Sequence, residues 1–378
     1  MRFRSRRSRG FQNRSPLAAE LQQLEPRALP TGIVTAAVSG QNVTITGDKL
    51  DNSILIEVRA DGVFLTGLAG ETAETNTTLK FGGQPVAVGT PVQLTTTPSL
   101  KNLTIQMGDG NDNVRIEVGE ALPDPIPVPV PSPLAVTITG RVRISLGKGD
   151  DHGVLLVNHA TLNITGNLEG DLEAGNDCLV IGPAVAFDDS SNEIPDPLPI
   201  QVGGQAILLG RLGNDAITLV GAEVRKAVTI KGDDGADSIT LGSATLHGNL
   251  SIEGNKGNDV LLLGLTSVAG TTSIRGDAGA DQVIIAQVTA SKNVVVNLGN
   301  GDDQLAVSSL TVNVETIRVT FDGGAGTDSL TSIEDITDPP TKLKSIENAA
   351  ADIDAEAIIV SLESLTNECL DLTAPILP

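Results

Sequence analysis

The fold of this chain is decided by the stretch Leu250-Ser251-Ile252-Glu253-Gly254-Asn255-Lys256-Gly257-Asn258-Asp259-Val260-Leu261-Leu262-Leu263. Leu250 and Ile252 alternate with polar residues, and Leu261 and Leu263 hold alternate positions after a glycine-rich turn. A period of two is typical of strands that bury one face, and glycine accepts the positive φ angles of a tight turn. The stretch therefore predicts a strand, a turn and a second strand.

The turn recurs nine times between Met107 and Leu330, always as Gly-x-Asp. Its aspartates are Asp112, Asp151, Asp177, Asp215, Asp237, Asp259, Asp281, Asp303 and Asp328. The four intervals from Asp215 to Asp303 are 22 residues each. A fixed period in the range of about 20–50 residues marks a solenoid of stacked repeats. With a weaker third apolar pair per repeat, such as Leu310 and Val312, we predict an all-β parallel β-helix, or β-solenoid. It has about 22 residues per coil and one Gly/Asp-rich column of turns.

Two longer intervals carry proline-rich excesses, near residues 120–134 and 187–200. Proline cannot donate a hydrogen bond to a sheet, so these excesses are predicted to be loops. The 22-residue register resumes after each excess, which favours insertions into one solenoid over linkers between domains. We expect both loops to leave the same edge, near Gly119 and Gly182, and to carry recognition.

The two ends of the chain differ from its middle. Residues 1–31 are basic and are predicted to be an export or sorting segment, and residues 32–106 are predicted to be degenerate N-terminal coils that cap the solenoid. The regular solenoid is expected over 107–335, followed by a C-terminal cap or tail over 336–378. Within that tail, the Ala-, Glu- and Ile-rich stretch Ser345–Leu365 predicts a capping helix.

Composition limits the possible partners. The formal net charge is −22 and the pI is about 4.4, which argues against nucleic acid or an anionic membrane as a partner. No apolar run reaches the ~20 residues of a membrane span. The chain has no Trp and no Tyr, and its two cysteines, Cys178 and Cys369, are too few for their pairing to be predicted. An acidic chain of this kind suits an extracellular setting.

The turns resemble the Gly-Gly-x-Gly-x-Asp-x-apolar-x repeat of repeats-in-toxin, or hemolysin-type, calcium-binding proteins. Residues 323–331 match every position, and the turns that begin at Gly210, Gly232, Gly254 and Gly276 lack only the second glycine. The resemblance implies Ca²⁺ held between stacked turns by Asp215, Asp237, Asp259, Asp281 and Asp328, and by the matching Asp112, Asp151, Asp177 and Asp303. This chain has one motif per 22 residues, whereas that family has two per 18. Without metal, each aspartate would cap its turn by accepting backbone N–H groups.

The N-terminal segment carries a second resemblance. Six arginines within residues 1–14 are followed by Leu24-Glu25-Pro26-Arg27-Ala28-Leu29 and a small-residue break at Thr31-Gly32. This arrangement resembles the short N-terminal segment of many large exported or surface proteins of planctomycete bacteria. It departs from that pattern at Pro30, where the family usually has a second leucine. The resemblance implies an extracellular or cell-surface location.

Together these features predict an exported or cell-surface, calcium-binding β-solenoid with a structural or adhesive role. Its partners are calcium ions and a surface polysaccharide or protein. The alternative is a polysaccharide-active β-helix enzyme, a lyase or glycoside hydrolase, which needs two carboxyls at a defined separation. The adjacent acids Asp150-Asp151, Asp233-Asp234 and Asp302-Asp303 fall in the repeated turn, so repetition explains them and no catalytic residue is predicted. The three histidines have no metal-ligand spacing and are expected to be solvated.

Overall fold

The computed structural model describes residues 32–70, 76–120, 132–184, 199–312, 317–332, 341–344 and 348–351. All of them belong to the unit Thr31–Pro378. The predicted export segment, the greater part of both proline-rich insertions and most of the C-terminal tail lie outside these residues.

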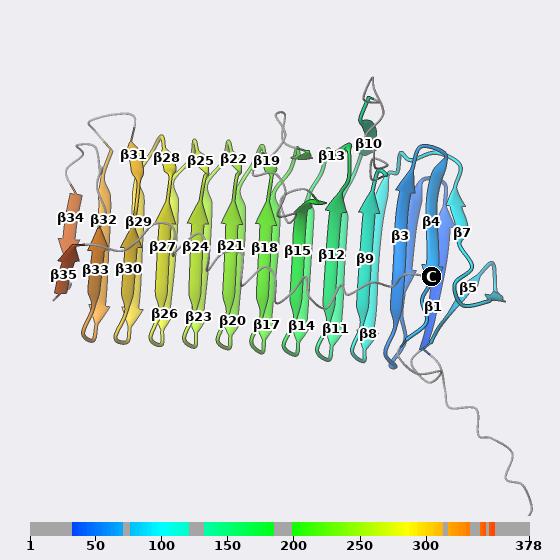
Figure 1. Cartoon of the computed structure of the whole chain (residues 1–378), viewed down its shortest axis with the longest axis horizontal. Helices are drawn as coiled ribbons and strands as arrows, with labels where there is room; N and C mark the ends of the chain where they lie inside the picture. The colour runs from blue at the N-terminus through cyan, green and yellow to red at the C-terminus, as the bar shows by residue number, and fades with distance from the viewer. Residues whose placement is uncertain are drawn as a thin grey trace, which may run out of the picture. The chain divides into compact units, whose positions relative to one another are not determined.

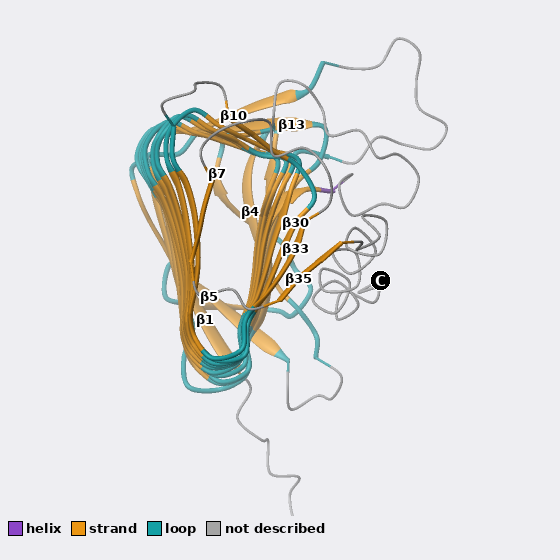
Figure 2. Ribbon diagram, turned by 90° about the vertical axis from the view of Figure 1, so that its left-hand side faces the viewer, coloured by secondary structure: helices purple, strands orange, loops and turns teal. Residues whose placement is uncertain are grey.

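The described residues form three long sheets of stacked strands, so the predicted parallel β-solenoid is confirmed (Figure 1). Along the stack, two long sheets, A and B, face each other, and the short sheet C closes the third side (Figure 2). Each full coil runs from a strand of sheet A, through the Gly/Asp turn, to a strand of sheet B and then to a strand of sheet C. No helix occurs in the part of the chain that the structure describes.

The strands follow in stacking order within each sheet. Sheet A contains β34 (Thr341–Lys344), β32 (Val319–Ala325), β29 (Val294–Asn300), β26 (Thr272–Ala278), β23 (Leu250–Lys256), β20 (Val228–Asp234), β17 (Ala206–Leu212), β14 (Leu168–Ala174), β11 (Val142–Lys148), β8 (Asn102–Asp109), β2 (Asn42–Thr46), β1 (Gly32–Ser39), β5 (Thr77–Phe81) and β6 (Gln84–Val86). Sheet B contains β35 (Asn348–Ala351), β33 (Ser329–Ser332), β30 (Gln304–Val307), β27 (Gln282–Ala286), β24 (Val260–Gly264), β21 (Ser238–Gly242), β18 (Ala216–Val220), β15 (Cys178–Pro183), β12 (His152–Val157), β9 (Asn113–Val118), β3 (Ser53–Arg59), β4 (Gly62–Gly67) and β7 (Val92–Thr95). Sheet C contains β10 (Leu134–Ile138), β13 (Ala160–Ile164), β16 (Ile200–Val202), β19 (Ala222–Val224), β22 (Thr245–Leu246), β25 (Ser267–Val268), β28 (Val288–Ala290) and β31 (Leu310–Val312).

The core is a set of aliphatic ladders inside the coils. The two alternating positions predicted from Leu250 and Ile252 are buried, and so are Leu261 and Leu263 after the turn. Parallel pairing in exact register places Val228, Leu250 and Thr272 above one another, and likewise along the rest of each strand. Each side chain therefore packs on its equivalent in the next coil, and small and aliphatic residues suit this stacking.

The N-terminal end departs from the coil pattern. Only β2 and β3 pair in parallel with the next coil, through β8 and β9. The neighbouring strands pair as antiparallel hairpins, β1 with β2, β3 with β4 and β5 with β6. Residues predicted to be degenerate coils thus form one partial coil flanked by hairpins.

At the C-terminal end, β34 and β35 extend sheets A and B by one further coil. The predicted helix over Ser345–Leu365 is wrong at Asn348–Ala351, which is a strand, and the rest of that stretch lies outside the described residues. The alanines that suggested a helix also fit a strand, because the preceding coil supplies a parallel edge to which they can pair.

The two insertions leave the solenoid at the same corner. One lies between β9 and β10 and the other between β15 and β16, so both connect sheet B to sheet C. Their coils are separated by one coil, that of β12 and β13. Pro127 and Pro197 lie outside the described residues, so the direction that each loop takes stays a prediction.

Candidate functional site

The nine Gly/Asp turns join sheet A to sheet B and stack into one column. In the turn of Asp259, Asn255 has a φ of +78° and Gly257 a φ of +129°. The residue four places before the aspartate has a positive φ in all nine coils, although five of the nine are not glycine: Glu173, Arg211, Asp233, Asn255 and Asp277. Loss of the second glycine therefore does not change the sign of φ at this position. The stacked turn imposes this conformation on residues that ordinarily avoid it.

The glycine two places before each aspartate is required for two separate reasons. Its φ lies in the positive region in every coil, as at Gly257. A Cβ at Gly257 would also lie 1.6 Å from the carbonyl oxygen of Gly235 in the coil before it. Any larger residue would therefore push the coils apart. The recurring glycine follows from turn conformation and coil spacing alone.

The nine predicted aspartates form a continuous buried ladder. The backbone N–H of Asp237 donates to Oδ1 of Asp259 at 2.8 Å, and the N–H of Asp259 donates to Oδ1 of Asp281 at 2.9 Å. The same bond, at 2.7–3.1 Å, links every neighbouring pair from Asn52 to Asp328. Every aspartate of the ladder is at most 2 % exposed. We call these nine aspartates with Asn52 the inner ladder.

Asn52 was missed by the sequence motif because its turn lacks the Gly-x-Asp spelling. Its N–H donates to Oδ1 of Asp112 at 2.7 Å, and its side chain is 1 % exposed. The signal that could have found it is the polar pair Asp51-Asn52 directly before the alternating strand Ser53–Arg59, which matches Asn111-Asp112 before Asn113–Val118.

A second ladder runs beside the first on the exposed side of the turn. The N–H of Ala280 donates to Oδ1 of Asn258 at 2.8 Å, so here the earlier coil supplies the acceptor. This outer ladder uses the residue just before each aspartate. Its acceptors are Asp51, Asn111, Asp150, Asn176, Asn214, Asn258 and Asp302. The two ladders run in opposite directions, so neighbouring turns are joined both ways wherever the outer position carries an acceptor, and by the inner ladder alone after Ala236 and Ala280.

The second carboxylate oxygen of the inner ladder has a different environment. Oδ2 is buried without a hydrogen-bond partner among the described residues at the eight positions from Asp112 to Asp303. A Cβ on Gly254 would lie 2.3 Å from Oδ2 of Asp259. At Gly210, Gly232, Gly254 and Gly276 the first glycine of the motif therefore leaves room for the carboxyl group. An amide NH₂ there would have no acceptor.

Burial governs the acidity of the inner ladder. Desolvation raises the pKa of Asp177 to about 8, of Asp237 to about 7 and of Asp259 to about 6. The N–H bond to each Oδ1 works in the opposite direction, and neighbouring aspartates raise the pKa further. Loss of hydration is thus a larger cause of the raised pKa values than repulsion between stacked charges.

The side chains of the inner ladder form no metal-holding cluster in the part of the chain that the structure describes. Each Oδ1 already accepts an amide N–H, and each Oδ2 of the eight buried positions has no hydrogen-bond partner among the described residues. Ca²⁺ takes six to eight oxygen ligands, and no group of three or more His, Cys, Asp or Glu side chains in the described ranges is placed to hold a metal ion. Calcium binding stays a prediction from the resemblance.

The other candidate residues are spread over the surface. Asp151 and Asp303 belong to the inner ladder, so the adjacent acids at these positions are split between a buried and an exposed carboxyl. Asp234 pairs with Lys256 at 2.8 Å. His247 lies 2.9 Å from Glu223 and is exposed, as expected, whereas His152 is only 7 % exposed, so its predicted solvation was wrong.

A surface hollow at the N-terminal end is lined by Gly40, Gln41, residues 93–97 and Ser99. These residues include no carboxylate, imidazole or amine, so the hollow offers no acid or base for catalysis.

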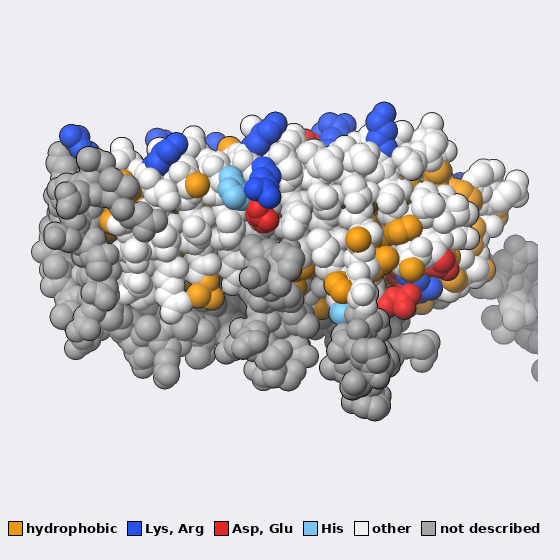
Figure 3. Space-filling view, turned by 90° about the horizontal axis from the view of Figure 1, so that it is seen from above, with side chains coloured by type: hydrophobic (Ala, Val, Ile, Leu, Met, Phe, Trp, Pro, Cys, Tyr) orange, Lys and Arg blue, Asp and Glu red, His pale blue; other side chains and the backbone are white. Residues whose placement is uncertain are grey.

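Exposed cations gather on the corner between sheets C and A, away from the acidic turns. The exposed cations that lie one or two residues before a strand of sheet A are Lys101, Arg141, Lys226, Lys292 and Arg318. Blue side chains follow one border of the face seen from above (Figure 3). This corner thus differs from the Gly/Asp turns, where exposed cations such as Lys148 and Lys256 are paired with acids.

Comparisons with known proteins add no assignment: no family model matches this chain, and neither the curated proteins nor the solved structures that were searched contain a match. The part of the chain that the structure describes contains no helix long and apolar enough to cross a membrane.

Proposed function

We propose that this chain is an exported or cell-surface β-solenoid with a structural or adhesive role. The observation that carries the proposal is the pair of ladders that joins every turn from Asn52 to Asp328. Together with three sheets of backbone hydrogen bonds, they fix each coil on the next. Such a stack resists bending and extends by repetition, which suits a spacer or scaffold.

Three observations support the exported location and the adhesive role. Cys178 is disulfide-bonded, and disulfides persist in oxidising compartments outside the cytosol. Both proline-rich insertions are anchored at the corner between sheets B and C, where a rigid scaffold can present them together. The cationic corner between sheets C and A would suit an anionic polymer such as an acidic polysaccharide.

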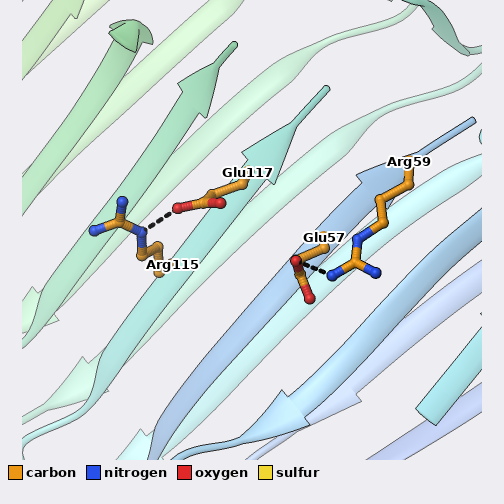
Figure 4. A network of polar contacts seen from close by, with 4 residues as sticks. All are labelled: Glu57, Arg59, Arg115 and Glu117. Atoms are coloured by element: carbon orange, nitrogen blue, oxygen red, sulfur yellow. Dashed lines mark hydrogen bonds and ion pairs between the residues drawn. The ribbon is translucent and has the colours of Figure 1, made fainter. Parts of the chain in front are cut away.

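The alternative, a polysaccharide-active enzyme, would need an arginine and two carboxyls converging on a substrate. In Figure 4, Arg115 instead pairs with Glu117 at 2.6 Å, and Arg59 pairs with Glu57, each two residues along its own strand. These guanidinium groups are therefore already neutralised by their own neighbours.

The dependence of the melting temperature on Ca²⁺ distinguishes a solenoid that is stable without metal from one that calcium stabilises. The experiment compares thermal unfolding of the full chain in chelator and in millimolar Ca²⁺, at low salt and pH 7.5. We expect the same melting temperature in both, because the turns are already joined by amide bonds. A rise in Ca²⁺ that disappears in Asp259→Ala would support the calcium hypothesis instead, through linkage of binding to folding. Mg²⁺ at the same concentration controls for general screening of the acidic surface.

A further inference from the structure

The outward face of sheet B carries a row of side chains that are almost fully buried. Strand alternation places Leu262 on the face opposite Leu261 and Leu263, which belong to the core. Register pairing continues this row along the stack as Val154, Val180, Thr218, Thr240, Leu262, Ile284 and Ala306. These residues are between 0 and 6 % exposed, and we call them the outer row of sheet B.

The equivalent row on sheet A shows that outward positions of this solenoid are not buried by their own coil. That row runs Thr104, Arg143, Glu169, Ile207, Thr229, Ser251, Ser273, Val295 and Thr320, and none of them is buried. Its most apolar late member, Val295, is 42 % exposed, against 1 % for Leu262. The outer row of sheet B is therefore both more apolar and more enclosed than its counterpart.

At its N-terminal end, the outer row of sheet B is followed by charged residues. In the next coil toward the N-terminus the register partner of Val154 is Arg115, which pairs with Glu117 (Figure 4). One coil further, Glu57 pairs with Arg59 on the same face. The apolar surface thus extends from β12 to β30 and no further in that direction.

Cys178 lies on this same face, at the N-terminal part of the row. It is two residues before Val180 on β15 and clusters with it apart from the core. It is disulfide-bonded, and the only other cysteine in the sequence is Cys369. We propose that the C-terminal segment 352–378 lies along the outer row of sheet B as a strap, fixed at its far end by a Cys178–Cys369 disulfide.

The length of the chain fits this path. Ala351 ends β35, the last strand of sheet B, and β15 is seven strands away in the stack. Seven spacings of about 4.8 Å amount to roughly 34 Å. The 18 residues from Ala351 to Cys369 span up to about 60 Å when extended, so they reach Cys178 with slack to follow the row. The line from β35 to β15 crosses Ala306, Ile284 and Leu262 in turn.

The composition of the segment also fits the row. It contains Ile358-Ile359-Val360, Leu362 and Leu365 between β35 and Cys369, which can cover the apolar positions. Formation of the disulfide joins the two Sγ atoms and releases two protons and two electrons, which an exchanging disulfide of the exported compartment accepts. The strap would tie the last coil to the middle of the stack and shield an otherwise exposed apolar strip.

The first test maps the disulfide in the full chain. Trypsin cuts after Lys148, Arg211 and Lys344, so digestion without reduction should give peptide 149–211 linked to peptide 345–378. The protein should remain monomeric on a non-reducing gel. A free Cys178 thiol, or a linkage that makes a covalent dimer, would overturn the proposal in favour of no strap or of a second copy.

The second test asks what shields the row, by hydroxyl-radical footprinting of the full chain. In the intact protein Leu262 should be labelled several-fold less than Leu265, which is 62 % exposed in the same coil. The variant combines Cys369→Ser with Ile359→Asp and Leu362→Asp, and should raise labelling of Leu262 and Ile284 several-fold while Leu261 stays protected.

The matched control combines Cys369→Ser with Ser361→Asp and Ser364→Asp, which adds the same charge and removes no apolar contact. It should label Leu262 less than the test variant does. Unchanged protection of Leu262 in the test variant would show that another segment covers the row, and the strap would be wrong.

Discussion

The inner and outer ladders occupy adjacent residues of the same turn and use the same hydrogen bond in two environments. At the inner position the carboxyl is at most 2 % exposed, and all nine predicted coils have Asp there. At the outer position, Asn258 and its equivalents are exposed, and the residue varies among Asn, Asp, Ala and Thr. The repeats of this one chain therefore show which acceptor the stack requires and which it merely accommodates.

The difference has a physical cause. An exposed amide N–H that loses its side-chain acceptor can turn to water, whereas a buried N–H cannot. Ala236 and Ala280 interrupt the outer ladder, and the coils still stack in register around them. The inner ladder has no such gap from Asn52 to Asp328, so it is the part of the turn on which stability depends.

The largest expected effect is on pH dependence, because it sums over the whole inner ladder. Burial raises the pKa of Asp177 to about 8 and of Asp281 to about 7, above the ordinary value of about 4 in an unfolded chain. Between these values the folded state binds more protons than the unfolded state, so stability must fall as pH rises. The contribution of the inner-ladder aspartates to the free energy of unfolding is therefore largest below about pH 4 and is lost progressively up to about pH 8. Thermal melting from pH 4 to 8.5 measures this.

Asp177→Asn supplies the control for that titration. It removes the group whose pKa is raised to about 8 and should flatten the upper part of the stability curve, above pH 7. An exposed acid of the outer ladder, changed as Asp150→Asn, should alter the curve much less, because its charge only adds to the pKa shifts of Asp151 and Asp177, whose largest cause is burial. Stability that rises steadily from pH 4 to 8 would contradict the raised pKa values.

The second effect concerns the glycine two places before each inner-ladder aspartate, such as Gly257. Gly257→Ala places a Cβ 1.6 Å from the carbonyl oxygen of Gly235, so the coils must separate or the turn must rearrange. We expect a loss of about 3 kcal/mol or more in the free energy of unfolding. Gly82→Ala is the matched control, since Gly82 also has a positive φ but nothing lies within 4 Å of its Cβ position. It should cost about 1 kcal/mol. Equal losses, measured by denaturant unfolding, would show that φ strain alone explains the motif.

The third effect is the loss of one inner acceptor. Asp259→Ala leaves the buried N–H of Asp237 unsatisfied and opens the space beside Gly254. A loss of about 1–3 kcal/mol is expected from the unpaired donor. Part of it is offset at high pH, because a buried carboxylate is removed as well. The loss should therefore be larger at pH 5 than at pH 8, and urea unfolding at the two values tests that difference.

The sequence predicted the architecture well, because a 22-residue period with alternating aliphatic residues leaves few other folds. The inward positions of Leu250 and Ile252 and the common column of nine aspartates followed from it. Two things could not be predicted from the sequence. That Asn255 and its equivalents keep a positive φ without glycine depends on the neighbouring coils, and so does the direction of each aspartate hydrogen bond. The C-terminal strand β35 was missed because its alanines have no strand preference of their own.

The smallest expected effect is at the outer ladder. Asn258→Ala removes the acceptor of the Ala280 N–H, at 2.8 Å, but both groups lie at the exposed turn, where water replaces the bond. The loss should be below about 1 kcal/mol, and Ala236 and Ala280 show that the stack already tolerates alanine at this position. Measured beside Asp259→Ala in the same coil and buffer, the two variants compare one hydrogen bond in two environments. A loss at Asn258 that equals the loss at Asp259 would mean that burial is not what separates the ladders. The stability of the turn would then come from amide capping on both sides equally.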